Sequence, residues 1–339
     1  MPILNAETLI IAFEKLGDFI ANPDEKFDSL LQSSRNNNAW FTEEEVKKAL
    51  NSLHLMLQRV DLEQWFKGIS ISDNPKKIGL ILAGNIPLVG FHDVLSVLAT
   101  GNIALIKLSS ADDKLLPAVL NKLTEIEPKL ADHIVYTERL KDYDAVIATG
   151  SNNSSRYFDY YFGKVPNIIR KNRTSVAVLT GKETTEDITK LGHDLFDYFG
   201  LGCRNVSKIY IPENYDIKDF FEPLEQYNPI INHFKYNNNY DYNKSIYLVN
   251  GAKHYDNGFL LLKEDTGFSS PLAVLYFEKF ASLTEVEDKL KDHAENLQCV
   301  VTTAPLVIPT PTTGFGETQQ PRLWDYADNV NTVTFLNSL

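Results

Sequence analysis

The sequence predicts an α/β protein with two domains, the first of which contains a doubly wound parallel sheet. Its 339 residues are enough for two hydrophobic cores. From residue 77 onward, short apolar runs occur without alternation, as expected of strands buried on both faces. Stretches of helical length separate these runs, and parallel strands need crossovers of that size.

The region before the sheet is predicted to be helical up to about Phe66. Apolar residues recur three and four positions apart in ETLIIAFEKLGDFI and EVKKALNSLHLMLQRVDLEQWF. Thr42 followed by Glu45 fits a capping box at the start of the second of these segments.

The strands of the first domain are expected in the runs KIGLILAG, NIALIKL, HIVYTE, DAVIATG and SVAVLTG. In the second domain the helical segment DITKLGHDLFDYFGLG precedes Cys203, and strand-like runs follow at SKIYIP, KSIYLVN, GFLLL, PLAVLYFEKF and LQCVVTT, with a helix between the last two. Residues 232–244 are expected to form a solvated loop, and LVIPTPTTGFGETQQP an irregular connection. The predicted domains are residues 1–184 and 185–310, followed by a C-terminal segment at 311–339.

Composition excludes several classes of protein. A net charge of -12 repels nucleic acid and anionic membranes. The N-terminus resembles an amphipathic helix more than a signal peptide, and no apolar run reaches the ~18 residues of a membrane helix, so a cytoplasmic protein is expected. Two distant cysteines and scattered histidines supply neither a disulfide framework nor a metal site.

Polar residues follow two of the predicted strands. Asn85, after Gly84, is suited to donating its amide N–H to an oxyanion, although asparagine is also favoured by turn geometry alone. Lys107, Ser109 and Ser110 end another strand and are suited to holding a ribose and a phosphate, although a lysine there is more often simply solvated.

A third strand ends in Thr149, Gly150 and Ser151, where a helix is predicted to begin. Backbone N–H groups at a helix N-terminus attract phosphate, which favours a pyrophosphate contact. The G-x-G-x-x-G pattern of ordinary dinucleotide-binding folds is absent from this turn.

Cys203 lies between a glycine-rich break and Arg204, a setting that exposes a thiolate and favours its charge. The alternative is a small buried hydrophobic residue, and Cys299, within an apolar run, fits that alternative better. His92 and His193 are expected to be packing or helix-surface residues.

Taken in order, four segments resemble the aldehyde dehydrogenase superfamily: NIPL, ATGNIALIKLSSAD, ATGS and GLGC. They correspond to the family's N-x-P-L turn, AxGNxxxxKPSE, FTGS and GQxC segments. The resemblance implies an aldehyde dehydrogenase-like fold with a Rossmann-like parallel sheet in the cofactor domain. The short chain and the closing segment ETQQPRLWDYADNVNTVTFL are most similar to the bacterial long-chain acyl-CoA reductases (LuxC-like) related to the reductase of bioluminescence.

The resemblance implies roles residue by residue. Cys203 is the expected nucleophile and Asn85 part of the oxyanion hole. Apart from the resemblance, Arg204, next to Cys203, is a candidate for activating the thiol. Lys107 and Ser109 are expected near the adenosine ribose, and Gly150 and Ser151 near the pyrophosphate. The complete set of expected cofactor-binding residues is Gly84, Lys107, Ser109, Ser110, Thr149, Gly150 and Ser151.

Three departures from the family pattern refine these expectations. Arg170 takes about the place of the glutamate that activates water in hydrolytic members, which favours reduction over hydrolysis, since a cation cannot be a general base. Ser110 replaces the glutamate of KPSE, which favours NADPH over NADH. The E-x-F-G-P motif survives only as GFSSP at residues 267–271.

The sequence therefore predicts an NADPH-dependent acyl-CoA reductase that forms an acyl-enzyme on Cys203 and releases a fatty aldehyde. An acyl-phosphate reductase remains open, as does an acyl-transfer protein acylated on Cys203 without redox chemistry. A partner protein that receives the acyl group also remains open, and a homodimer is expected by analogy with the superfamily.

Overall fold

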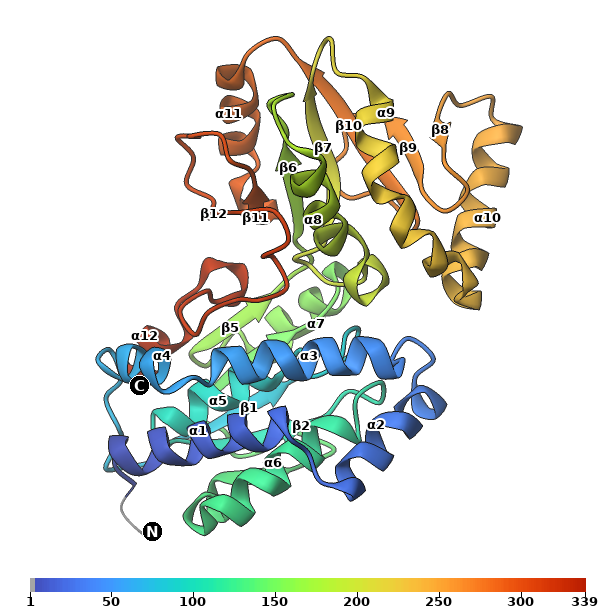
Figure 1. Cartoon of the computed structure of the whole chain (residues 1–339). Coiled ribbons are helices and arrows are strands. Elements are labelled where there is room, and N and C mark those ends of the chain that lie inside the picture. Colours follow the sequence, from blue (N-terminus) through green and yellow to red (C-terminus); the bar gives the residue numbers. More distant parts are fainter. Residues whose placement is uncertain (1–3) are drawn as a thin grey trace. The chain divides into compact units, whose positions relative to one another are not determined.

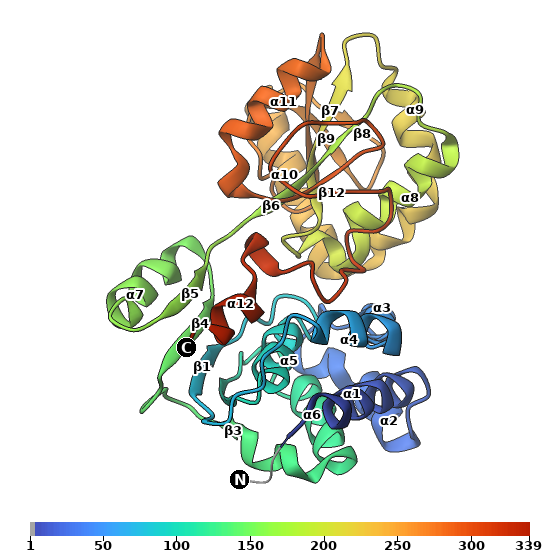
Figure 2. The same ribbon diagram turned by 90° about the vertical axis from the view of Figure 1, so that its left-hand side faces the viewer.

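A computed structural model describes residues 4–339, and the chain divides into two compact units. Unit 1 comprises the chain up to Asn172 together with Gln320–Tyr326 and Val330–Leu339, and unit 2 comprises Arg173–Gln319 with Ala327–Asn329. The predicted boundary after residue 184 lies further along the chain, and the predicted C-terminal segment 311–339 is shared between the units. Figures 1 and 2 show the elements of each unit.

Unit 1 begins with a helical region that ends at Phe66, as predicted. It contains α1 (Ala6–Ala21), α2 (Glu25–Asn37), α3 (Glu43–Met56) and α4 (Arg59–Phe66), so the second predicted helical segment is divided into α3 and α4. Thr42 caps α3 by accepting the backbone N–H of Glu45, which is one half of the predicted capping box. Helices α1 and α2 pack against α6 (Leu115–Ile126), so the N-terminal helices form an additional layer over a crossover helix.

The sheet of unit 1 is wholly parallel, with strand order β3-β2-β1-β4-β5. Its strands are β1 (Lys77–Ile81), β2 (Ile103–Lys107), β3 (Ile134–Tyr136), β4 (Ala145–Thr149) and β5 (Asn167–Arg170). The crossovers contain α5 (Phe91–Ala99), α6 with the 3₁₀ turn η1 (Pro128–His133), and α7 (Asn152–Phe162). The C-terminal helix α12 (Thr332–Asn337) packs on α5. The sequence prediction missed β5.

Unit 2 contains a seven-stranded sheet of order β12-β11-β6-β7-β10-β9-β8. Its strands are β6 (Thr174–Val178), β7 (Val206–Pro212), β8 (Tyr255–Asp256), β9 (Leu261–Glu264), β10 (Val274–Phe280), β11 (Leu297–Val301) and β12 (Thr312–Thr313). All pairs are parallel except β8 with β9. The run SVAVLTG forms β6 of this sheet, so its assignment to the first domain is wrong.

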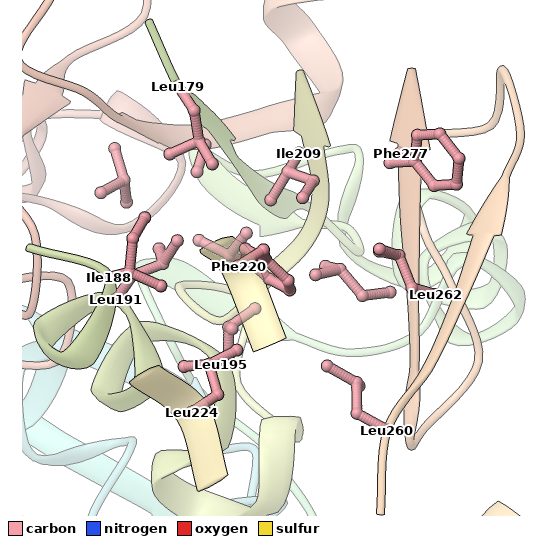
Figure 3. Close-up of a cluster of buried hydrophobic side chains, with 14 of the residues drawn as sticks. Leu179, Ile188, Leu191, Leu195, Ile209, Phe220, Leu224, Leu260, Leu262 and Phe277 are labelled. Atoms are coloured by element: carbon pink, nitrogen blue, oxygen red, sulfur yellow. The ribbon is translucent and has the colours of Figure 1, made fainter. Parts of the chain in front are cut away.

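The helical elements of unit 2 are α8 (Thr185–Phe196), η2 (Asp197–Gly200), α9 (Ile217–Phe221), η3 (Glu222–Asn232), α10 (Phe234–Val249), α11 (Leu283–Asp292) and η4 (Ala294–Asn296); η5 (Ala327–Asn329) joins this unit. Side chains such as Ile209 enter the buried cluster shared with α8 and α9 (Figure 3), whereas Tyr210 enters the cluster on the α11 face. Burial on both faces explains why the strands are continuously apolar.

The chain around α10 corrects two predictions, because the expected loop at 232–244 and the expected strand KSIYLVN largely form one helix. Tyr236, Tyr240, Asn243 and Tyr247 are spaced four, three and four residues apart and are its buried residues. The hydroxyl of Tyr236 donates to the carbonyl of Phe259 at 3.0 Å, so this aromatic side is both packed and hydrogen-bonded. The helical spacing of the tyrosines therefore determines the structure of this segment, although its composition is polar.

The LVIPTPTTGFGETQQP stretch is largely irregular, as predicted, and contributes only the short β12. Among residues 4–339, no helix combines the length and apolar character needed to cross a membrane.

Candidate active site

Three predicted segments meet at the carboxyl edge of the unit 1 sheet. Register pairs Ile81 at the end of β1 with Lys107 at the end of β2 and with Ala148 near the end of β4. The chain places β2 and β3 on one side of β1 and β4 and β5 on the other, so the topology reverses between β1 and β4. Open α/β sheets bind ligands in the crevice at such a switch point.

The turn after β1 touches the loop after β2. A Cβ atom added to Gly84 would lie 2.5 Å from Ser109 Oγ and 2.7 Å from its Cβ, distances that real Cβ atoms do not tolerate. Glycine is therefore required for this close approach of the two loops. Gly84 has a packing role here that the resemblance alone did not supply.

Asp112, which the sequence analysis missed, fixes the N-x-P-L turn. Its buried carboxylate accepts the backbone N–H of Leu88 at 2.8 Å and that of Leu116 at 3.4 Å. Leu88 has a left-handed φ of 59°, which a leucine adopts only when its surroundings impose it. Burial raises the Asp112 pKa, and the backbone hydrogen bonds oppose that rise. The sequence signal for this role is the pair of aspartates, Asp112-Asp113, which comes shortly before α6.

The polar residues of this edge differ in exposure. Asn85, Lys107 and Ser110 are exposed, whereas Ser109 is half-buried and its Oγ accepts the Ala111 N–H at 3.3 Å. The exposed amide, ammonium and hydroxyl groups are able to contact a polar ligand. Ser110, which the sequence analysis placed at the position of the family's glutamate, is neutral.

The end of β4 leads into α7 as predicted. Ser151 is its N-cap, and its Oγ accepts the Ser154 N–H at 3.3 Å, so this hydroxyl is committed to the helix. Thr149 and Gly150 are half-buried. The positive end of the α7 dipole lies at the carboxyl edge of the sheet, an arrangement suited to phosphate.

Arg170 ends β5 and is buried in unit 1, with 3% of its surface exposed. Its guanidinium donates to the Asp93 carboxylate on α5 and to Thr332 Oγ1 on α12, the latter at 3.0 Å. Arg170, which the sequence analysis placed at about the position of the hydrolytic glutamate, is therefore part of a buried hydrogen-bonded ion pair that links β5, α5 and α12.

Cys203 lies in unit 2, in the turn between α8 and β7. The preceding residues Tyr198, Phe199 and Gly200 have φ values of 54°, 58° and 77°, which reverse the chain sharply after the helix. Cys203 is partly exposed. Tyrosine and phenylalanine rarely adopt this conformation, so the turn is imposed by its neighbours.

Asn205, also missed from the sequence, holds this turn together. Its Oδ1 accepts the Gly202 N–H at 2.8 Å, and its Nδ2 donates to the carbonyls of Asp194 at 3.1 Å and Asp197 at 2.9 Å. The amide of Asn205, which follows Cys203, therefore holds Gly202, which precedes it, to the end of α8.

Ser175 lies behind the nucleophile candidate. Its Oγ donates to the Cys203 carbonyl and lies 3.1 Å from that oxygen and 3.1 Å from Cys299 Sγ. Cys299 is buried, and this burial raises the pKa of its thiol, with the Arg204 cation opposing the rise. The prediction that Cys299 is a small buried residue is confirmed. The positive charge of Arg204 acts on the Cys299 thiol.

The remaining candidates have structural contacts. His92 Nε2 lies 2.9 Å from the Leu323 carbonyl and its ring packs near Trp65. His193, half-exposed on α8, pairs with Asp197 at 3.3 Å. Both agree with the packing and helix-surface roles expected of them.

The GFSSP segment is held on β7. Ser207 Oγ donates to the Phe268 carbonyl at 2.6 Å, and Lys208 Nζ donates to the Thr266 carbonyl at 3.0 Å. Burial lowers the Lys208 pKa, while its pairing with Glu278 at 2.5 Å opposes this effect.

Solved structures similar to this chain show that it has the aldehyde dehydrogenase fold. Aldehyde dehydrogenase 21 of Physcomitrella patens, solved with succinate, matches with a TM-score of 0.66 and 14% identity over 99% of this chain and 84% of its own. An aldehyde dehydrogenase of Mycobacterium tuberculosis complexed with NAD+ matches with a TM-score of 0.62 and 12% identity, covering 92% and 77%. The NADP-dependent glyceraldehyde-3-phosphate dehydrogenase of Bacillus halodurans, complexed with NADP, has a TM-score of 0.63 and 11% identity, covering 92% and 79%.

The family model described as acyl-CoA reductase (LuxC) matches residues 27–226, more than half of the chain. The chain belongs to this family. A curated relative, long-chain acyl-protein thioester reductase 2 of Photobacterium leiognathi, is 26% identical in an alignment of 166 residues that covers 43% of this chain and 34% of the relative. The matched region therefore spans about a third of that relative's length.

Proposed function

We propose that this protein reduces a long-chain acyl-CoA to the fatty aldehyde through an acyl-enzyme on Cys203, with NADPH as the reductant. The main supporting observation is that Cys203 is a partly exposed thiol in a hydrogen-bonded turn, whereas Cys299 is buried. Membership of the acyl-CoA reductase family supports the substrate class.

The proposed reaction begins when the Cys203 thiolate attacks the acyl carbon. The carbon–sulfur bond to CoA breaks and CoA leaves as a thiolate, so the acyl group is held as a thioester of Cys203. The Asn85 amide and the Cys203 backbone N–H are the proposed donors to the oxyanion. After reduction, the bond between Cys203 Sγ and the former acyl carbon breaks, which releases the aldehyde and regenerates the thiolate.

A reduced nicotinamide, when bound, supplies the hydride. The chemistry of the unit 1 edge fits such a group, because the exposed Lys107 and Ser110 and the N-terminus of α7 suit phosphates and ribose hydroxyls. We propose that Gly84, Ser109, Thr149, Gly150 and Ser151 complete this site.

The proposed preference for NADPH depends on Ser110. A glutamate there would repel the 2′-phosphate, whereas Lys107 attracts it. Ser110→Glu is expected to weaken NADPH binding roughly tenfold or more relative to NADH. Titration of both cofactors measures this ratio, with Ser110→Gln as the neutral control of equal size. An unchanged ratio in Ser110→Glu would remove the argument for NADPH.

Reduction rather than hydrolysis is supported by Arg170. Its cation is buried beside Asp93 and cannot accept a proton from water. We therefore expect the acyl-enzyme to survive in the absence of a reductant. Mass spectrometry after mixing with acyl-CoA alone tests this by following the mass of the Cys203 peptide.

The name of the curated relative describes reduction of an acyl-protein thioester. An acyl-protein thioester is therefore the second acyl donor that we propose. The test is NADPH oxidation with acyl-CoA, acyl-protein thioester and acyl phosphate as alternative substrates, for wild type and Cys203→Ala. Acylation of Cys203 without any oxidation of NADPH would indicate an acyl-transfer protein instead.

We also propose a homodimer, by analogy with the superfamily, and light scattering tests it separately.

A further inference from the structure

One buried side chain closes the turn that contains Cys203. Asn205 is 3% exposed, and its amide makes one accepting and two donating hydrogen bonds to backbone groups that precede Cys203. Asn205 also donates its own backbone N–H to the Gly202 carbonyl at 3.1 Å. The Gly202–Asn205 turn is thus closed by backbone and side chain together.

The hydrogen-bonding pattern requires an amide. Gly202 presents an N–H group, so the side chain must accept; Asp194 and Asp197 present carbonyl oxygens, so the same side chain must donate twice. An aspartate of equal size would keep the acceptor but place a carboxylate against two carbonyl oxygens. An alanine would leave buried backbone groups without these partners.

The segment before the turn needs external support. Tyr198 and Phe199 are in the left-handed region, which costs conformational energy in residues with a Cβ. Such a conformation persists only when the surrounding structure over-determines it. Asn205 provides that restraint at Asp197, one residue before Tyr198, and Ser175 provides another at the Cys203 carbonyl.

We propose that Asn205 is a positioning residue for Cys203, fixing the backbone from which the thiol attacks the acyl carbon. This inference rests on the proposed function, in which Cys203 accepts the acyl group. Because a displacement of about 1 Å can cost roughly 100-fold in rate, loss of this restraint lowers acyl transfer even when the thiol itself stays intact. Asn205 acts through the backbone of the turn, so its effect falls on kcat more than on KM.

The test compares Asn205→Ala and Asn205→Asp with Asn243→Ala. Asn243 is a matched control, since it is buried in the same unit and its Nδ2 donates to the carbonyls of Asn239 and Leu272, both at 2.9 Å. For each variant, kcat and KM for acyl-CoA are measured, together with the rate of Cys203 alkylation by iodoacetamide. Amide hydrogen exchange of the peptide covering residues 198–206 reports on the turn independently of activity.

Both Asn205 variants are expected to exchange faster in residues 198–206 and to lose roughly 10- to 100-fold in kcat, with KM changed less than about threefold. Alkylation by the small reagent, which needs no fixed geometry, is expected to stay within about threefold. Asn243→Ala is expected to keep the wild-type kcat. Faster exchange with an unchanged kcat would overturn the positioning role while leaving the proposed function intact. A wild type with protected exchange but no turnover of any thioester would instead refute the proposed function and, with it, this inference.

Discussion

The buried pair of Arg170 and Asp93 allows a quantitative prediction about unit 1. Their side chains are 4% and 5% exposed, and Arg170 also donates to Thr332 on the C-terminal helix. Arg170→Met removes the cation but keeps most of the volume, which leaves the Asp93 carboxylate buried without its counter-ion. We expect the free energy of unfolding to fall by about 3–5 kcal/mol.

The double variant Arg170→Met/Asp93→Leu distinguishes this reason from a loss of packing. Replacing both charges with apolar side chains removes the uncompensated carboxylate, so the double variant is expected to be more stable than Arg170→Met alone. For a domain of 150–250 residues, the single change corresponds to a loss of roughly 6–20 °C in Tm. Lys47→Met, which breaks an exposed ion pair with Glu43 in the same unit, is the control and is expected to change little.

The assay is urea denaturation followed by tryptophan fluorescence. The three tryptophans of the chain, Trp40, Trp65 and Trp324, all belong to unit 1, so their emission reports on that unit. A single variant within about 1 kcal/mol of wild type, or a double variant no more stable than the single one, would refute the reasoning.

Three further predictions concern the candidate sites. Iodoacetamide should label Cys203 but not Cys299 in the native protein, and labelling of Cys299 detected by mass spectrometry would contradict this difference between the two thiols. Cys299→Ser should keep turnover within about twofold. Gly84→Ala should weaken NADPH binding roughly tenfold, because the added Cβ meets Ser109. In a fluorescence titration, the double variant Gly84→Ala/Ser109→Gly should recover most of that loss. A double variant that binds NADPH no better than Gly84→Ala would exclude the contact as the cause. Burial raises the pKa of Asp194 from 3.8 to about 6, so the folded state binds this proton more tightly than the unfolded chain does. Wild type should therefore lose roughly 2 kcal/mol relative to Asp194→Asn between pH 4 and pH 7, measured by urea denaturation followed by circular dichroism. A pH-independent difference would be inconsistent with that shift.

The sequence was most informative where a local pattern has a direct structural consequence. Continuous apolar runs predicted the parallel strands, and their polar ends predicted which residues gather at the carboxyl edge of unit 1. The different settings of Cys203 and Cys299 predicted which thiol is partly exposed. These features depend on residues within a few positions of one another, so a single sequence contains the necessary signal.

Other features depend on partners far apart in the chain. The strand SVAVLTG resembles its predecessors, and nothing within it specifies that it pairs with β7 and β11 in the second sheet. Arg170 and Asp93 are 77 positions apart, so their buried ion pair is visible only in the fold. Asn205 is closer in sequence to its partners, but its role depends on the left-handed conformation of Tyr198 and Phe199. Tyrosine and phenylalanine disfavour that conformation, so the sequence does not predict the turn.

The most direct test of the central proposal is NADPH oxidation at about 340 nm with a series of acyl-CoAs, measured for wild type and Cys203→Ala side by side. We predict turnover by wild type, aldehyde formed in equal amount to the NADPH consumed, and loss of turnover in Cys203→Ala with normal folding by circular dichroism. Undiminished turnover in Cys203→Ala, or acylation of wild-type Cys203 without oxidation of NADPH by any acyl-CoA, would contradict the proposal.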